Sequence, residues 1–212
     1  MFRITGDDWD KWDDIDPWHF DNAAAFAPMI ARAGLMGQSS YPDLDMLPLG
    51  FVSASGDSHH YPTHQTNLTN DEATVQFTLW CIARSPLFFG GDMPHLATDP
   101  FTFGLLTDVE VLNMNEFSKN NREVKNDPEK KLRFWAAEST KNEGFYYAAI
   151  FNNAEDDQNV NVLDIDFAFP PNAVDVFDVW AKEPVTNDEL SALNVKTHGT
   201  RLLRFFTKGN DN

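Results

Sequence analysis

The stretch TNDEATVQFTLWCIARSPLFFGG, residues 69–91, holds a helix and the strand that follows it. Thr69 and Glu72 have the spacing of a capping box, and apolar residues then recur at helical spacing, so a helix is predicted here. Arg84-Ser85-Pro86 ends that helix, and Leu87–Gly91 predicts a short buried strand with glycines at its C-terminal end. Helices that alternate with strands in this way build parallel sheets.

Two more strands and a helix are expected on the N-terminal side of this unit. Residues 2–5 read as the end of a strand, and residues 43–47 read as a second buried strand. Between them, residues 20–33 predict a helix, with a kink or a division into two short helices at Pro28.

The polar stretch 51–66 reads as a long surface loop and contains His59, His60 and His64. A zinc site would want a fourth ligand close to these histidines. We therefore expect no metal centre in this loop and no cofactor elsewhere in the chain.

Two short helices, near residues 99–107 and 109–115, complete the order of alternating strands and helices. Three parallel strands alone would leave long unpaired edges, and a parallel sheet needs cover on both faces. A full eight-unit barrel takes about 250 residues. Residues 1–118 therefore predict one piece of a larger barrel.

The pattern changes after residue 118. Residues 119–130 are polar and charged and are predicted to be a linker. Short strands separated by turn-rich stretches then predict a small antiparallel β-sandwich domain over residues 131–212. The strand-like segments are Leu132–Ala137, Phe145–Phe151, Val160–Phe167, Val174–Trp180 and Leu202–Phe206.

The composition is that of a globular and strongly acidic protein. Hydrophobic residues make up 42% of the 212, which is enough for a sizeable core. The formal net charge of −17 disfavours nucleic acid and anionic membrane surfaces as partners, and no stretch approaches the ~20 apolar residues of a membrane span. The N-terminal sequence lacks the layout of a signal peptide. Cys81, the one cysteine, is expected to be a buried thiol that forms no intrachain disulfide.

The segment Arg3-Ile4-Thr5-Gly6-Asp7-Asp8-Trp9 leads from a strand end into a loop with an arginine, two carboxylates and an aromatic ring. Barrel enzymes place catalytic groups at the C-terminal ends of their strands. Arginine can donate hydrogen bonds to sugar hydroxyls, and Trp9 offers a flat apolar wall for a sugar face. The alternative is a solvated acidic loop, because residues 7–16 hold six aspartates.

Asp43 and Asp45 form a second candidate group. They are two residues apart in an expected strand, so both should face the same side, where burial requires hydrogen bonds or a function. Two loop aspartates ahead of the strand are an alternative, as is a divalent metal site, although no His or Glu completes one at a recognisable spacing. A third group, Gly90-Gly91-Asp92, fits either an active-site loop or a turn with a capping aspartate.

Taken in this order, the motifs resemble glycoside hydrolase family 27, the family of α-galactosidases and α-N-acetylgalactosaminidases. The Arg-Ile-Thr-Gly-Asp segment looks closest to plant-like members. The resemblance covers residues 1 to about 118 closely and continues loosely through Phe177–Ala181 and His198-Gly199. The segments that carry it are Phe2–Asp7, Tyr41–Gly50, Leu68–Glu72, Thr78–Leu87, Gly90–Asp92 and Leu105–Leu112.

The resemblance implies a fold and a set of roles. The fold would be the C-terminal part of a (β/α)8 TIM barrel, about its last three βα units, followed by a small antiparallel β-sandwich. Asp7 would be the general acid/base, Arg3 would contact the sugar, and Met46 would line the galactose pocket. The remaining candidates would support the pocket: Asp8, Trp9, Asp43 and Asp45. The mechanism would be a retaining double displacement with two carboxylates about 5 Å apart.

The sequence departs from the family in one respect. The nucleophile normally lies in a Lys-x-Asp-x-Cys type motif on strand four, and no such motif is present. Lys11-Trp12-Asp13 offers Lys-x-Asp, but it follows Asp7 on a loop and is not a candidate. We therefore expect a fragment that lacks the nucleophile and is inactive alone. A non-catalytic remnant, or a carbohydrate-binding or interaction module, is the alternative.

The resemblance also implies partners and a location. An α-galactoside oligosaccharide or glycoconjugate would be the substrate, and the N-terminal half of the barrel would be the protein partner. The location would be secreted, lysosomal or vacuolar. The sequence leaves the choice between galactose, N-acetylgalactosamine and arabinopyranose open.

Overall fold

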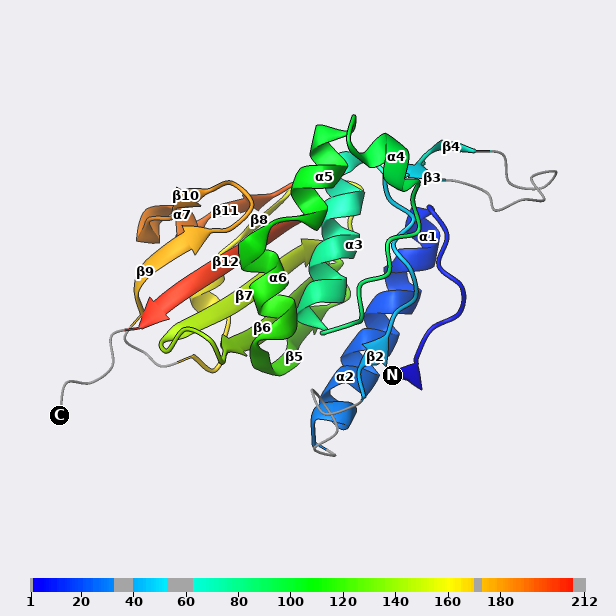
Figure 1. Cartoon of the computed structure of the whole chain (residues 1–212). Coiled ribbons are helices and arrows are strands. Elements are labelled where there is room, and N and C mark those ends of the chain that lie inside the picture. Colours follow the sequence, from blue (N-terminus) through cyan, green and yellow to red (C-terminus); the bar gives the residue numbers. More distant parts are fainter. Residues whose placement is uncertain (1, 33–39, 53–62, 170–172, 208–212) are drawn as a thin grey trace.

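Helix α3, Asn70–Ile82, occupies the centre of the molecule and is buried along almost its whole length (Figure 1). The structure is a computed structural model, and it describes residues 2–32, 40–52, 63–169 and 173–207. The predicted capping box is confirmed: the Thr69 hydroxyl accepts from the Glu72 N–H, and the Glu72 carboxylate accepts from the Thr69 N–H. Burial raises the pKa of the Cys81 thiol well above its ordinary value.

The parallel strands that precede α3 in the sequence are very short. Strand β1, Phe2–Arg3, pairs in parallel with β2, Pro42–Asp43. A single parallel bridge between Leu47 and Phe89 extends this arrangement. Strands β3, Phe51–Val52, and β4, His64–Gln65, form a separate antiparallel pair.

Two of the predicted buried strands are wrong in extent. The strand expected over residues 43–47 ends at Asp43, because Asp45 adopts a left-handed backbone conformation, with φ of 81°. The strand expected over Leu87–Gly91 is reduced to isolated bridges, and Phe88 is exposed. Of the predicted histidine loop, His64 lies in β4, whereas His59 and His60 lie outside the described residues.

The remaining helices cover this part of the chain. Helix α2, Phe20–Arg32, contains Pro28 and is one helix rather than two short ones. The two short helices predicted before residue 118 are confirmed, with Asp99 and Asp108 as their N-caps. In chain order the helices are α1, Trp12–Asp14, a π-helical turn, Ile15–His19, then α2, α3, α4, Met93–Leu96, α5, Pro100–Leu106, and α6, Val109–Glu116.

A six-stranded antiparallel sheet follows, in the order β10-β9-β12-β7-β6-β5. The linker predicted for residues 119–130 is wrong, because most of that stretch forms the edge strand β5, paired with β6. The strands are β5, Ser118–Asp127, β6, Leu132–Ser139, β7, Phe145–Asn152, β9, Ala173–Asp178, β10, Glu183–Pro184, and β12, Gly199–Thr207.

A second, smaller layer completes the β-sandwich. Strand β8, Gln158–Val160, pairs antiparallel with β11, Leu193–Val195, and helix α7, Asn187–Ser191, lies beside them. The strand predicted over Val160–Phe167 is wrong beyond Val160, because a 3-10 turn, Val162–Asp164, follows it.

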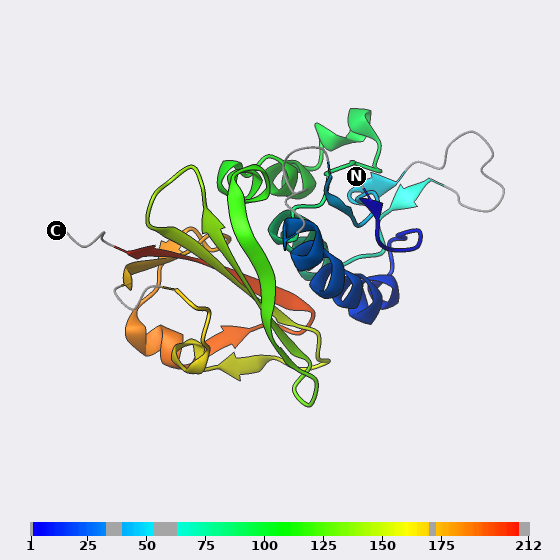
Figure 2. The same cartoon turned by 90° about the horizontal axis from the view of Figure 1, so that it is seen from below.

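Alternation along the strands divides the core into two clusters, one on each face of the sheet. Trp135 and Phe151 face the helices, together with residues of α2 and α3. Phe134 and Ile150, their neighbours along the same strands, face the second layer. Figure 2 shows the sheet between the helices on one side and the α7 layer on the other. This arrangement confirms the predicted antiparallel sandwich.

Several contacts join the helical part to the sheet. The indole N–H of Trp180 donates to the Thr78 hydroxyl at 2.9 Å, and His198 Nδ1 lies 2.8 Å from a Glu72 oxygen. The first core cluster is continuous across residue 118. The predicted division of the chain at that residue stays a prediction.

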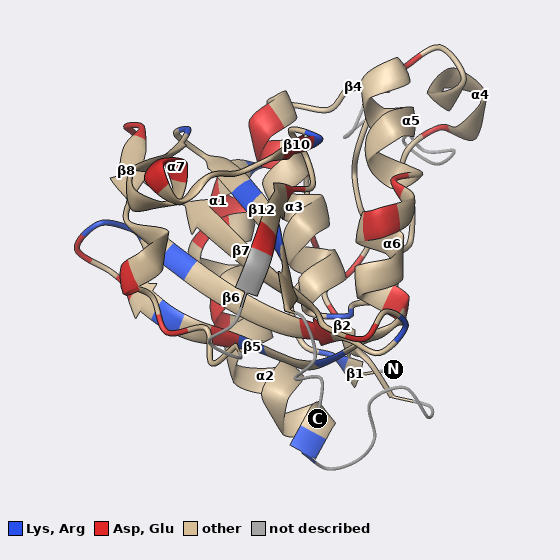
Figure 3. Cartoon of the chain, turned by 90° about the vertical axis from the view of Figure 1, so that its left-hand side faces the viewer, with Lys and Arg blue, Asp and Glu red and all other residues tan. Residues whose placement is uncertain are grey.

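Acidic residues are spread over helices, loops and sheet rather than gathered on one element (Figure 3). No helix among the described residues has the length and apolar character needed to cross a membrane.

Candidate functional site

The guanidinium of Arg3 joins the loops that follow β1 and β2. Its Nη2 lies 2.6 Å from Asp45 Oδ2 and 3.3 Å from Asp7 Oδ1, and it also donates to the Gly6 carbonyl at 2.7 Å. These groups meet because β1 and β2 are parallel, so their C-terminal ends lie at one edge. The spacing of four residues between Arg3 and Asp7 therefore corresponds to a direct contact.

Asp45 is the most highly connected residue of this group. Its Oδ2 accepts from the Asp8 N–H at 2.7 Å as well as from Arg3, and its carbonyl accepts from the Trp80 indole at 2.8 Å. Its own N–H donates to Asp43 Oδ1 at 3.0 Å. The expectation that Asp43 and Asp45 face the same side of a strand is wrong, because the left-handed φ of Asp45 breaks the alternation.

Asp8 is buried behind this arrangement with His19 and Gln76. Its Oδ2 accepts from Gln76 Nε2 at 2.5 Å, and its Oδ1 lies 3.7 Å from His19 Nε2. Burial is the main cause that raises the pKa of Asp8 to about 9, and the nearby charges of Asp45 and Asp14 raise it further. Asp8 is therefore a neutral carboxylic acid at pH 7.

His19 is in the protonation state that complements Asp8. Burial lowers its pKa, so the ring is neutral, and its Nδ1 donates to the Asp14 carbonyl at 2.5 Å. Its Nε2 then carries a lone pair that faces the protonated Asp8 carboxyl. The ring stacks on Trp80 with centroids 5.1 Å apart, which fixes its orientation. A neutral pair thus lies behind the charged groups.

Asp7 differs from these carboxylates in its exposure. Its side chain is 81% exposed, whereas Asp8, Asp43 and Asp45 are largely withdrawn from solvent. Trp9 and Met46, which follow Asp8 and Asp45 in the chain, are 40% and 45% exposed. Asp7 is therefore the carboxylate of this group that a bound molecule can reach.

Gly90 gives Met46 its space. A Cβ built at Gly90 would lie 2.8 Å from the Met46 sulfur, so any larger residue there would displace the methionine. Asp92 occupies the N-cap position of α4, but its carboxylate pairs with His95 instead of capping the helix. In the motif Gly90-Gly91-Asp92, Gly90 thus leaves room for Met46, and Asp92 lies in the turn before α4.

Asp7 is exposed to solvent, as a solvated acidic loop would also have it, but Asp10 is not. Asp10 is buried, and its Oδ2 accepts from the Asn67 N–H and the Asn67 side-chain amide, both at 2.8 Å, and lies 2.9 Å from His64 Nε2. Sequence reasoning did not single out Asp10, His19, Gln76 or Trp80. The buried helix α3 was predicted, and a polar Gln76 on it was an available signal.

No group of three or more His, Cys, Asp or Glu within the described ranges could hold a metal ion. The arrangement offers one exposed carboxylate, an arginine tied to it and two partly exposed apolar side chains. A general acid/base with a sugar-binding arginine is chemistry that these groups can supply.

Comparisons with known proteins concern the fold of the chain. The family model of the "Alpha galactosidase C-terminal beta sandwich domain" matches residues 129–205. An α-galactosidase of Zygotorulaspora mrakii is 26% identical over 167 residues, which cover 72% of this chain and 32% of the relative.

Two solved structures align with almost the whole chain. A GH27 β-L-arabinopyranosidase from Geobacillus stearothermophilus, in complex with arabinose, is 28% identical with a TM-score of 0.78. The alignment covers 98% of this chain and 45% of the Geobacillus chain. A putative α-N-acetylgalactosaminidase from Bacillus halodurans is 27% identical with a TM-score of 0.77. The alignment covers 97% of this chain and 46% of the Bacillus chain.

The chain spans about half or less of the length of the relatives it matches. Those matches do not confirm the plant-like subgroup. The matched sandwich model, the α-galactosidase relatives and the structural alignment with GH27 enzymes agree on one conclusion: the chain is similar to the C-terminal portion of glycoside hydrolase family 27 enzymes.

Proposed function

We propose that this chain supplies the general acid/base side of a retaining glycosidase active site, with Asp7 as the acid/base. The observation that carries the proposal is the contact of Arg3 with both Asp7 and Asp45 at the shared end of two parallel strands. Substrates would be terminal α-D-galactosyl residues or sugars of closely related ring shape.

The roles follow from the contacts. In a double displacement one carboxylate attacks the anomeric carbon, while the other protonates the leaving oxygen and then takes a proton from water. Asp7 fits the second role because it is exposed and adjacent to a cation. Arg3 is held by Asp45 and Gly6, so its remaining N–H groups can be directed at sugar hydroxyls. Trp9 and Met46 would supply apolar walls.

Asp8 would support this chemistry through its neutrality. Its backbone N–H holds Asp45, which in turn holds Arg3. A charged Asp8 would add a third negative charge beside a single arginine, and its raised pKa avoids that charge at neutral pH.

The nucleophile would come from the N-terminal half of the barrel. Within the described residues, β1 has only β2 as a strand partner. Large apolar side chains in this part of the chain, Phe2, Trp18 and Met29, are exposed. An unpaired edge with exposed apolar surface suits a further protein segment. The 212-residue chain alone should therefore self-associate, which light scattering can test, and a stable monomer would count against this part of the proposal.

The decisive experiment measures hydrolysis of an aryl α-galactoside. The chain alone should show no turnover. A chimera that joins it to the N-terminal half of the Geobacillus enzyme should be active, and Asp7→Asn in that chimera should lower the rate by roughly 10²–10⁴-fold. Azide, which needs no general base, should restore part of the rate with an activated leaving group.

The matched control is Asp13→Asn, which changes an exposed aspartate in the nearby helix α1 and should leave the rate unchanged. Full activity of Asp7→Asn would refute the acid/base role. Turnover by the chain alone would refute the expected need for a second segment. A folded chimera that binds the sugar without hydrolysing it would favour the non-catalytic carbohydrate-binding function.

A further inference from the structure

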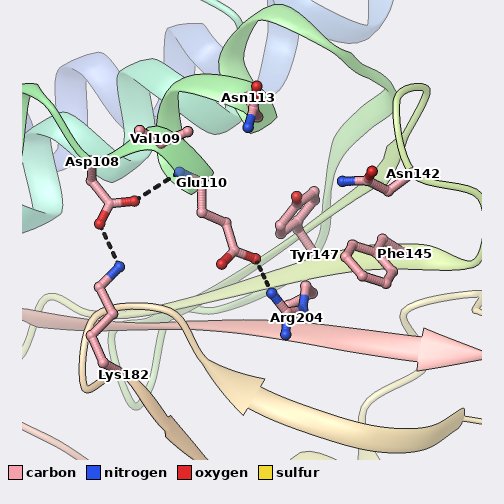
Figure 4. Close-up of a pocket in the computed structure, with 9 residues that line it drawn as sticks. All are labelled: Asp108, Val109, Glu110, Asn113, Asn142, Phe145, Tyr147, Lys182 and Arg204. Atoms are coloured by element: carbon pink, nitrogen blue, oxygen red, sulfur yellow. Dashed lines mark hydrogen bonds and ion pairs between the residues drawn. The ribbon is translucent and has the colours of Figure 1, made fainter.

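A polar cavity lies between α6 and the sheet, and none of its lining residues belongs to the strand-end group (Figure 4). Its volume is about 390 Å³. The first turn of α6 forms one wall, and β7 with the turn before it forms another. Lys182 and Arg204 come from the turn after β9 and from β12. This volume lies in the range of small-molecule sites.

The charges around this cavity are already paired. Asp108 forms an ion pair with Lys182, and its second oxygen caps α6 by accepting from two backbone N–H groups. Glu110 Oε1 lies 2.7 Å from Arg204 Nη1. With two acids and two bases matched in this way, the cavity offers no net charge to an ionic ligand.

The uncharged groups of the cavity are a mixture of amides and aromatic rings. Phe145 presents a ring that Arg204 covers at 4.8 Å from the centroid. Asn113 receives Lys141 Nζ on its oxygen at 2.8 Å, which leaves its NH₂ group as a donor. Asn142 is an exposed turn residue whose side-chain amide faces the cavity in Figure 4. Donors, acceptors and a flat apolar face are thus combined.

Tyr147 is the most informative member. It is only 2% exposed, it lines the cavity, and within the described chain its hydroxyl has no hydrogen-bond partner. Figure 4 shows the ring between α6 and β12, with its hydroxyl on the side of α6. Burial, with a smaller contribution from Glu110, raises its pKa to about 12, so the hydroxyl remains a donor. A hydroxyl on the cavity wall with no partner in the protein is free to bond a molecule that enters the cavity.

We propose that this cavity binds a neutral, hydroxyl-rich ligand, a single sugar unit, at a site separate from Asp7. Sugar hydroxyls need donors and acceptors together, and the amides, the paired carboxylates and Tyr147 supply both. The Phe145 ring would contact the apolar face of the pyranose. The inference does not depend on catalysis at the strand ends.

The test is a titration of the ¹⁵N-labelled full chain with methyl α-D-galactopyranoside, followed by NMR. Saturable shifts are expected for the side-chain amides of Asn113 and Asn142. Tyr147→Phe removes only the hydroxyl and should raise Kd roughly five- to tenfold, the loss of one hydrogen bond. Tyr146→Phe is the matched control, because Tyr146 packs on Phe169 in the other core and should leave Kd unchanged.

Two further variants keep the result interpretable. Asn142→Ala alters an exposed position and tests the same site if Tyr147→Phe does not fold. Arg3→Ala separates the two sites and should leave these shifts intact. Absence of saturable shifts, unchanged affinity in both Tyr147→Phe and Asn142→Ala, or loss of the shifts in Arg3→Ala would each overturn the proposal.

Discussion

The six-stranded sheet and the parallel strands that carry Arg3 and Asp43 differ in how many strand partners and packing contacts this chain gives them. β5 and β12 are ten and nine residues long, and the four inner strands of the sheet are paired on both sides. β1 and β2 are two residues each, and β1 has one partner among the described residues. The sheet also packs a core on each face. The region that holds the candidate chemistry is thus the region with the least internal support.

The largest change in the free energy of unfolding is expected from one of two phenylalanine truncations, which together test this comparison. Phe151 is fully buried in the sheet and meets Phe20 edge to face at 5.0 Å, so Phe151→Ala should lower the free energy of unfolding by about 3–5 kcal/mol. Phe2 lies exposed in β1, and Phe2→Ala should change it by about 0.5 kcal/mol or less. Urea unfolding measures both. Equal losses would mean that the strand-end region is as well supported as the sheet.

The second test uses the buried acid beneath the strand ends. The folded chain keeps the Asp8 proton up to a pKa of about 9, whereas the unfolded chain loses it near 3.8. Between these values the unfolded chain binds fewer protons, so the stability that depends on Asp8 falls as pH rises, by at most about 1.4 kcal/mol per pH unit. Asp8→Asn should remove this loss and flatten the dependence.

Unfolding free energies at about pH 5 and about pH 8 provide the measurement, because both values lie inside that window. Asp13→Asn, at an exposed position, should follow the unchanged chain. If the curves of Asp8→Asn and the unchanged chain run parallel, Asp8 is ionised in the folded state. The strand-end region would then carry one more charge than we infer.

The smallest effect is expected from a comparison of two capping boxes, one on the shared helix α3 and one on α7 of the sandwich. Thr69 caps the buried α3, and Thr186 caps the five-residue α7. Thr69→Ala should cost about 1 kcal/mol, because it weakens the start of the helix that both regions share, and Thr186→Ala should cost about 0.5 kcal/mol or less. Thermal unfolding resolves the order. The reverse order would show that α3 depends on packing and hardly on its cap.

The sequence predicted those elements whose signals are local. The capping box identified α3, and apolar runs identified β6, β7 and β12. Strand β5 was missed because an edge strand with one exposed face has the polar composition of a linker. The expected strand after Val160 was wrong because the Asn161 side chain caps a 3-10 turn there.

The candidate site was predictable to a similar depth. The sequence pattern singled out Arg3, Asp7 and Asp45 near the ends of expected parallel strands, but their mutual contacts come from the structure alone. The hydrogen bond between Asp8 and Gln76 depends on a helix 68 residues away in sequence from Asp8, and no local pattern reports it. Nor does the composition around Asp45 reveal its left-handed backbone.

The buried thiol of Cys81 makes α3 accessible to a labelling-rate measurement. Cys81 is the one thiol in the sequence, and it is fully buried on a helix whose Trp80 reaches the Asp45 carbonyl and whose Thr78 receives Trp180 of the sandwich. A thiol reagent reacts with the thiolate and so must wait until the helix opens. The labelling rate of the native chain would therefore measure how often the surroundings of Cys81 open to solvent.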